Sequence, residues 1–157
     1  MKRIISSIIF TLLLTGTGIL AQTEVDELWK EVSRTVAEGD FEGYSATFHT
    51  DAILVNGISK KSYPISNALN GWKQGFDDTK AGKMTASVEF RFSERLIGSV
   101  TAHETGIFKY SSQQEGGEAQ TVYIHFESLS SRTSGTWKMM MEYQVKIATE
   151  EEWAELE

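Results

Sequence analysis

The spacing of apolar residues changes once along the chain, near residue 84, and this change constrains the fold more than any other feature. Before it, apolar side chains recur every three or four residues, as in helices that bury one stripe. After it, apolar and polar residues alternate, as in strands with one buried face. Helices followed by an antiparallel sheet predict an α+β domain in which a curved sheet wraps around the N-terminal helices. The predicted strands span residues 84–95, 98–112, 120–131 and 136–147.

Three helices are expected before this change. The first is predicted to begin with Thr23 as its N-cap and to end at Gly39, which suits the left-handed C-cap conformation. Asp40 can cap a short second helix, and Ser66 can cap a third. The other expected segments are a buried strand at 52–56, a loop at 58–65, a polar connection at 77–83 and a C-terminal helix with a capping box from Thr149.

The N-terminus has the residue order of a secretory signal peptide. Lys2 and Arg3 precede an almost wholly apolar run that ends at Leu14, and Ala21 supplies the small residue before cleavage. The apolar run is shorter than the ~20 residues of a membrane-spanning helix, so we favour cleavage over a membrane anchor. We therefore expect residues 1–21 to be removed and residues 22–157 to form one domain, exported to the periplasm or the medium.

Charge and cysteine content exclude several classes of function. The formal net charge is −7, and cleavage would make it more negative by removing Lys2 and Arg3. An acidic chain without a basic stripe is not expected to bind nucleic acid or, once the signal is cleaved, a membrane. The chain has no cysteine, which excludes disulfides, thiolate catalysis and cysteine-ligated zinc. Because no close-spaced ligand motif is present either, we predict no metal and no cofactor.

Several short motifs resemble the nuclear transport factor 2-like superfamily, in its SnoaL-like or ketosteroid isomerase-like branch. They are the Gly39-Asp40 step, the aromatic residues Tyr44 and Phe48, the segment Asp51–Asn56 and the closing Gly-x-Trp-Lys pattern at 135–138. The resemblance implies a cone-shaped, cystatin-like fold with a pocket open at one end, and it implies a homodimer. Isomerases, dehydratases, cyclases, hydrolases and non-catalytic proteins share this fold, so fold alone does not assign an activity.

Ketosteroid isomerase chemistry is not expected. In that family the general base is an aspartate at the end of the strand that begins with Asp-Ala, and the matching position here is Asn56. An amide cannot accept a proton at working pH. The family's first-helix tyrosine aligns with Val32. Asn56 either orients a polar ligand group or turns the chain before Gly57.

The hairpin turns predict which side chains share a face of the sheet. If Gly116-Gly117 forms a two-residue turn, Phe108 lies opposite His125. If the next turn centres on Thr133, His125 lies opposite Met141, and residues opposite each other point to the same side. The predicted pocket wall contains Phe108, Tyr123, His125, Glu127, Met139, Met141 and Tyr143. His103 would then face the other side, although a slip of one residue would reverse this.

His125 is the best acid–base candidate on this face. The alternative is a partly buried histidine that a neighbouring residue satisfies. Trp72 lies on the third predicted helix, where it belongs either to the core or to the border of the pocket. The predicted ligand-binding residues are Asn56, Trp72, Phe108, Tyr123, His125, Glu127, Met141 and Tyr143.

Two functions remain open from the sequence. The first is an exported domain whose pocket binds a small, mainly apolar molecule, with catalysis of the isomerase or lyase type unassigned. The second is a non-catalytic interaction or dimerisation module whose cone is filled by side chains. An open cavity of a few hundred Å³ with some polar groups would favour the first.

Overall fold

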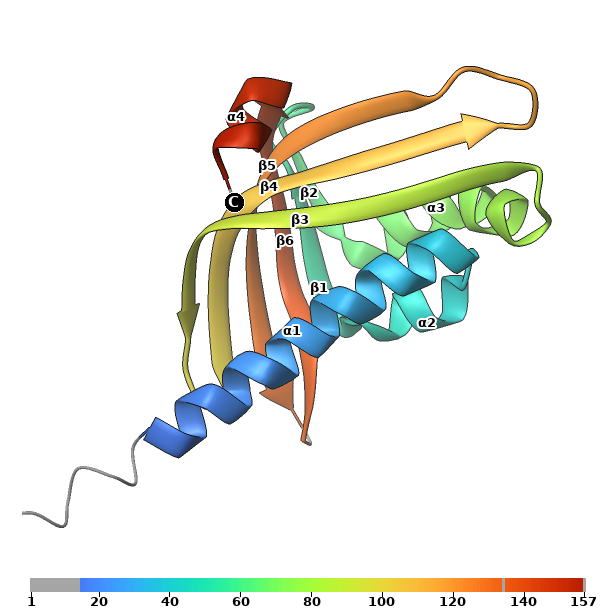
Figure 1. Cartoon of the computed structure of the whole chain (residues 1–157). Helices are drawn as coiled ribbons and strands as arrows, with labels where there is room; N and C mark the ends of the chain where they lie inside the picture. Colours follow the sequence, from blue (N-terminus) through green and yellow to red (C-terminus); the bar gives the residue numbers. More distant parts are fainter. Residues whose placement is uncertain (1–14, 134, 157) are drawn as a thin grey trace, which may run out of the picture.

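Figure 1 shows a computed structural model of the chain, which describes residues 15–133 and 135–156. Four helices accompany one six-stranded sheet in the described part, with strand order β2-β1-β6-β5-β4-β3. This arrangement confirms the predicted α+β class, with helices first and four long strands after them. The elements are α1 (Thr15–Glu38), α2 (Phe41–Ala46), β1 (Phe48–Asn56), β2 (Lys61–Pro64), α3 (Ile65–Lys80), β3 (Met84–Ile97), β4 (Thr101–Gln114), β5 (Gln120–Thr133), β6 (Thr136–Ala148) and α4 (Glu150–Glu155).

The sheet is mostly antiparallel, with one exception that the sequence did not predict. Strands β1 and β6 pair in parallel, while the other four neighbouring pairs are antiparallel. Part of the segment expected as a loop at 58–65 forms β2, an edge strand that pairs with β1 through Ile53 and Pro64. An edge strand tolerates proline because its outer N–H groups need no partner strand.

Within the described residues helix α1 already runs from Thr15, so the predicted start at Thr23 is wrong. The Thr23 hydroxyl donates to the carbonyl of Ile19 at 3.0 Å, as a residue inside a helix does. The preceding turn already accepts the backbone N–H groups there, so no cap is needed. Gly39 ends the helix with φ +66°, as predicted.

The predicted cleavage bond after Ala21 lies within α1, whereas residues 1–14 of the predicted signal lie outside the described residues.

Two carboxylates attach α1 to the sheet, and each is bound by one tryptophan and one arginine. Glu104 of β4 is 0% exposed and accepts hydrogen bonds from the Trp29 indole at 2.8 Å and from Arg95 Nε at 2.6 Å. Glu24 of α1 accepts in the same way from an indole and a guanidinium on the sheet. Its donors are Trp137 Nε1 and an Arg132 terminal nitrogen, both at 2.9 Å. Each carboxylate is therefore matched by one arginine and one tryptophan N–H.

Helix α3 differs at both ends from its predicted extent. It begins at Ile65, and its N-cap residue, Pro64, makes no side-chain capping bond, so Ser66 is not the cap. It continues to Lys80, through part of the predicted polar connection. The Lys73 ammonium contacts the Asp77 carboxylate at 2.8 Å, a pair spaced i,i+4 that supports the last turns.

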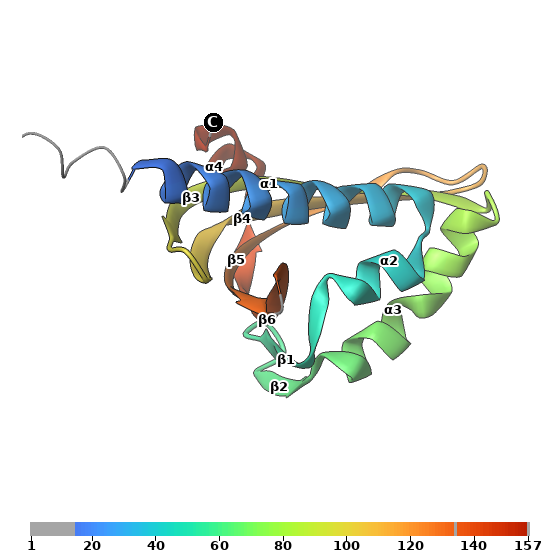
Figure 2. The same cartoon turned by 90° about the horizontal axis from the view of Figure 1, so that it is seen from below.

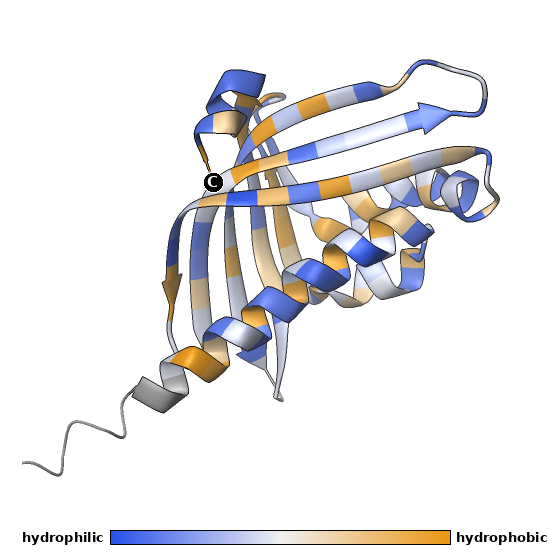
Figure 3. Ribbon diagram, viewed as in Figure 1, coloured by the Kyte–Doolittle hydropathy of each residue, from blue (hydrophilic) through white to orange (hydrophobic). Residues whose placement is uncertain are grey.

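The helices occupy both faces of the sheet. Helices α1, α2 and α3 lie on the concave face: Figure 2 shows α1 running along β3, while α2 and α3 lie toward β1 and β2. Helix α4 packs on the convex face, where Trp153 is buried near Tyr123 and Ile107. Thr149 and Glu152 form the predicted capping box of α4. Hydrophobic and hydrophilic residues alternate along the strands (Figure 3), so successive side chains of a strand point to opposite faces of the sheet.

No helix in the described part of the chain is both long enough and apolar enough to span a membrane.

Candidate functional site

A cavity of about 420 Å³ lies between the three N-terminal helices and the concave face of the sheet. Eight of its twenty lining residues are aromatic, and few are polar. This composition is typical of sites for small, mainly apolar ligands. The lining residues are Trp29, Val32, Val36, Tyr44, Gly71, Trp72, Gly75, Phe76, Thr79, Ala86, Val88, Phe90, Phe108, Tyr110, Val122, Ile124, Phe126, Met139, Glu142 and Gln144.

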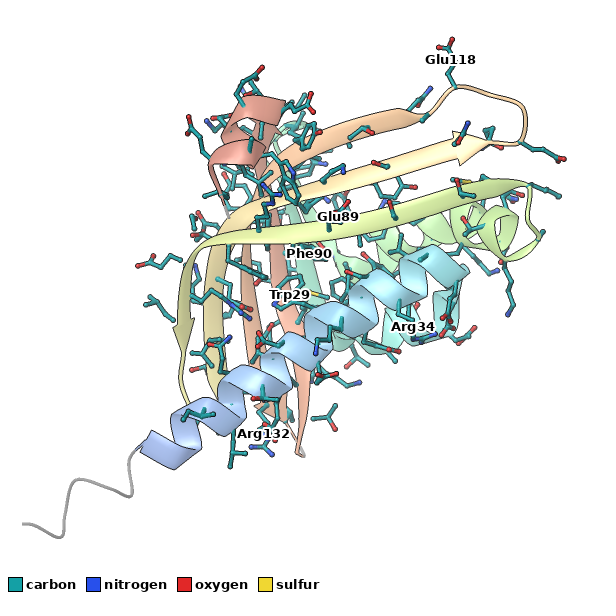
Figure 4. The ribbon with its side chains drawn as sticks, in the orientation of Figure 1. Trp29, Arg34, Glu89, Phe90, Glu118 and Arg132 are labelled. Carbon is teal, nitrogen blue, oxygen red and sulfur yellow. The ribbon has the colours of Figure 1, made fainter. Side chains whose placement is uncertain are left out.

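The aromatic wall of the cavity is built from strand residues that alternate toward the concave face. Phe90 of β3 and Phe126 of β5 point to the concave face, where Trp29 of α1 packs on both. The ring centroid of Trp29 lies 4.5 Å from that of Phe90 and 5.6 Å from that of Phe126. Figure 4 shows Trp29 and Phe90 in the space between α1 and β3. These tilted and edge-on contacts make a rigid wall of ring faces and edges.

Two glycines of α3 leave room in the cavity. Gly71 and Gly75 are one helical turn apart, and both line the cavity. A Cβ atom added at either position would meet nothing within 4 Å. Glycine inside a helix costs about 1 kcal/mol relative to alanine. Both glycines therefore lower the stability of α3, and the absence of their side chains leaves space in the cavity.

Glu142 of β6 is the acidic group of the cavity wall. Its Oε1 accepts a hydrogen bond from Gln144 Nε2 at 2.8 Å. Burial among apolar residues raises the pKa of Glu142 above its ordinary value of 4.5, although the Gln144 bond opposes this shift. Burial, and then the nearby Glu142 and Tyr110, raises the pKa of Tyr44 well above 10. Glu142 thus holds a proton at higher pH than an exposed glutamate, which suits proton transfer to or from a ligand.

The predicted register between β4 and β5 is wrong by one residue. Ile107, not Phe108, lies opposite His125. The connection is longer than a two-residue turn: Ser112 and Gln120 form its last pair, and Gly116 adopts φ +71°. A slip of one residue moves every side chain of a strand to the other face. Phe108 therefore lines the cavity, while His125 points to the convex face.

The predicted register between β5 and β6 is also wrong. His125 lies opposite Lys146, and Met141 lies opposite Leu129. Two irregularities in the pairing add to the shift, each with one extra residue on β6. The predicted wall residues that are absent from the cavity lining are Tyr123, His125, Glu127, Met141 and Tyr143.

His125 lies beside α4 rather than beside the cavity. Its Nε2 is 3.1 Å from an Oε1 of Glu152, yet no hydrogen bond between described residues satisfies this nitrogen. The backbone N–H of Thr149, and then His125, lowers the pKa of Glu152. His103 shares the convex face with His125, with its Nε2 3.6 Å from Glu127. No group of three or more potential ligands within residues 15–133 and 135–156 could hold a metal ion.

Of the two remaining predicted site residues, Trp72 lines the cavity and Asn56 does not. The Asn56 side chain accepts a hydrogen bond from the backbone N–H of Ser59 at 2.8 Å, which stabilises the turn after β1. Its amide also donates to Gln144 Oε1 at 3.4 Å, so Asn56 touches a cavity residue without lining the cavity itself. Trp72 lines the cavity and packs edge-on against Tyr44 at 6.1 Å between ring centroids.

Several polar residues of the cavity were not predicted as site residues, including Tyr44, Tyr110, Glu142 and Gln144. Glu142 was overlooked because the assumed register placed its neighbours Met141 and Tyr143 inside. The sequence did show a carboxylate, Glu142, in the middle of the last strand, between the apolar residue Met141 and the aromatic residue Tyr143. Only the correct register shows that this carboxylate faces inward.

Comparison with solved structures shows the fold. A conserved protein from Planctomyces limnophilus is similar with TM-score 0.68 and 12% identity, covering 80% of this chain and 94% of its own. A nuclear transport factor 2-like protein of unknown function from Shewanella oneidensis matches with TM-score 0.58 and 14% identity, covering 78% and 96%. A nuclear transport factor 2-like superfamily protein from Salmonella enterica matches with TM-score 0.62 and 9% identity, covering 84% and 94%. No protein-family model and no curated protein matches the sequence.

Proposed function

We propose that this chain, whose fold is that of nuclear transport factor 2-like proteins, binds a small, mainly apolar molecule in the cavity behind α1 and α3. The observation that carries the proposal is the cavity of about 420 Å³, whose wall is largely aromatic and includes one carboxyl group. Specific small-molecule sites combine an apolar wall with a few polar groups that orient the ligand. The open cavity argues against the alternative of a cone filled by side chains.

Proton-transfer catalysis of the isomerase or lyase type is the second candidate. The observation that favours it is the raised pKa of Glu142 inside an apolar cavity near Tyr44. Such a carboxyl can act as a general acid or base. In this form of the proposal Glu142 replaces His125 as the acid–base residue, because His125 lies on the opposite face of the sheet.

Binding of the neutral, polarity-sensitive dye prodan tests the first proposal. Its fluorescence should shift to the blue with the wild-type protein and saturate at one dye per chain. Gly75→Leu should reduce the affinity about tenfold or more, because the new side chain enters the cavity. Gln74→Leu is the matched control: it adds the same side chain at an exposed position of the same helix and should leave binding unchanged. Equal binding by both variants, or no binding by the wild type, would contradict the proposal.

A further inference from the structure

Glu142 differs from the two carboxylates, Glu24 and Glu104, that attach α1 to the sheet. Glu104 and Glu24 each hold one arginine and one indole N–H. Glu142 instead accepts one hydrogen bond, from the neutral amide of Gln144. No ion pair within residues 15–133 and 135–156 includes Glu142. Its charged form therefore has no cationic partner among the described residues.

The surroundings of Glu142 suit a cation better than an anion. Of the described residues that line the cavity, Glu142 alone carries a charge, and none is a lysine, arginine or histidine. Eight lining side chains are aromatic, and the faces of such rings attract ammonium groups. The formal net charge of the whole chain is −7, which favours the approach of cations over anions.

We infer that the ligand of this cavity is an apolar amine, whose ammonium group pairs with the Glu142 carboxylate while its hydrocarbon part lies among the aromatic rings. The inference rests on the proposed binding function and names the chemical class of its ligand. An ammonium supplies the charge-assisted partner that Glu142 lacks. An anionic ligand would bring a second negative charge into an apolar site and is disfavoured.

Three probes with one carbon skeleton test the inference: 4-phenylbutylamine, 4-phenylbutan-1-ol and 4-phenylbutyrate. Their binding to the whole chain is measured by calorimetry at pH 7.5, where an alkyl amine remains protonated. The amine should bind about tenfold more tightly than the alcohol, and the carboxylate should bind least. In Glu142→Gln the amine should lose about tenfold in affinity while the alcohol is nearly unaffected. Circular dichroism and prodan binding confirm that this variant is folded with its cavity open.

The outcomes separate the inference from the proposed function. If the alcohol binds as tightly as the amine, or if the amine keeps its advantage in Glu142→Gln, the ligand class is wrong and the binding function stands. If neither the three probes nor prodan binds, both proposals fail. An amine preference that disappears in Glu142→Gln supports both.

Discussion

At the scale of single residues, Glu142 is a carboxyl group that lines an apolar cavity. It lies on a strand that also carries Met139 and Gln144 to the cavity wall. Burial raises its pKa, so the folded state binds its proton more strongly than the unfolded chain does. Stability associated with Glu142 is therefore full below its ordinary pKa of 4.5 and falls as the pH rises above it.

The variant Glu142→Gln tests whether the stability contribution of Glu142 falls as the pH rises. Near pH 4 the two proteins should have similar free energies of unfolding, because Glu142 is then protonated in both the folded and unfolded states. Near pH 8 the variant should be the more stable of the two, because it buries no carboxylate. Urea unfolding at both pH values measures the difference. Glu118→Gln, which removes an exposed carboxylate at the tip of the β4–β5 connection (Figure 4), should show no such pH dependence. A stability difference that does not grow with pH would contradict the prediction.

At the scale of elements, the convex face of the sheet is only partly covered. Helix α4 packs on the end of this face that holds Ile107 and Tyr123. Farther along the strands, one row of paired residues crosses five strands on the same face. The row contains Leu96, His103, Leu129, Met141 and Ile53. Its apolar members include Leu129 at 40% exposed and Ile53 at 46% exposed.

We propose that this row is the contact surface of the homodimer expected from the sequence. Light scattering coupled to size-exclusion chromatography should give the mass of two chains for the wild type. Leu129→Asp should give the mass of one chain, because it places a charge in the centre of the apolar row. Ile58→Asp changes a residue of similar exposure, 45%, in the turn between β1 and β2 and should remain dimeric. A wild type that is monomeric at all concentrations tested would refute the proposal.

At the scale of the whole molecule, the side-chain hydrogen bonds between α1 and the sheet in the described residues come after the predicted cleavage bond, although Ala21, just before the bond, is buried in the core. Glu24 and Trp29 both lie C-terminal to Ala21. A chain that begins at Gln22 therefore keeps its bonds to Glu104, Arg132 and Trp137. The fold of the domain and removal of the first 21 residues are compatible.

We propose that the protein is exported and that cleavage occurs near Ala21. Intact-mass measurement of the protein from the periplasm or medium of an expressing bacterium should give a chain that begins within a residue or two of Gln22. A variant that carries Lys2→Glu and Arg3→Glu should stay in the cytoplasm with its full mass, because the positive region of the signal is lost. Full-length wild-type protein found only in the cytoplasm would show that the signal prediction is wrong.

The sequence by itself determined the class of each long element and several of their ends. The change of period near residue 84 predicted four strands, and Asp40 and Thr149 cap the helices α2 and α4 as expected. These features depend on local chemistry, since a cap or an alternating strand is defined by residues a few positions apart. The start of α1 was predicted too late, and the segment that forms β2 was predicted as a loop, because an edge strand is defined by the strand it pairs with.

Only the tertiary structure decided which residues form the site. Alternation with period two is the same whichever face of a strand is buried. A change of one residue in the β4–β5 connection therefore left Phe108 in the cavity and moved His125, predicted on the same face, to the convex face. The irregular pairing of β6 then brought Glu142 to the cavity. A carboxylate in a strand becomes a candidate site only when the register places it inside, and loop conformation and bulges set that register.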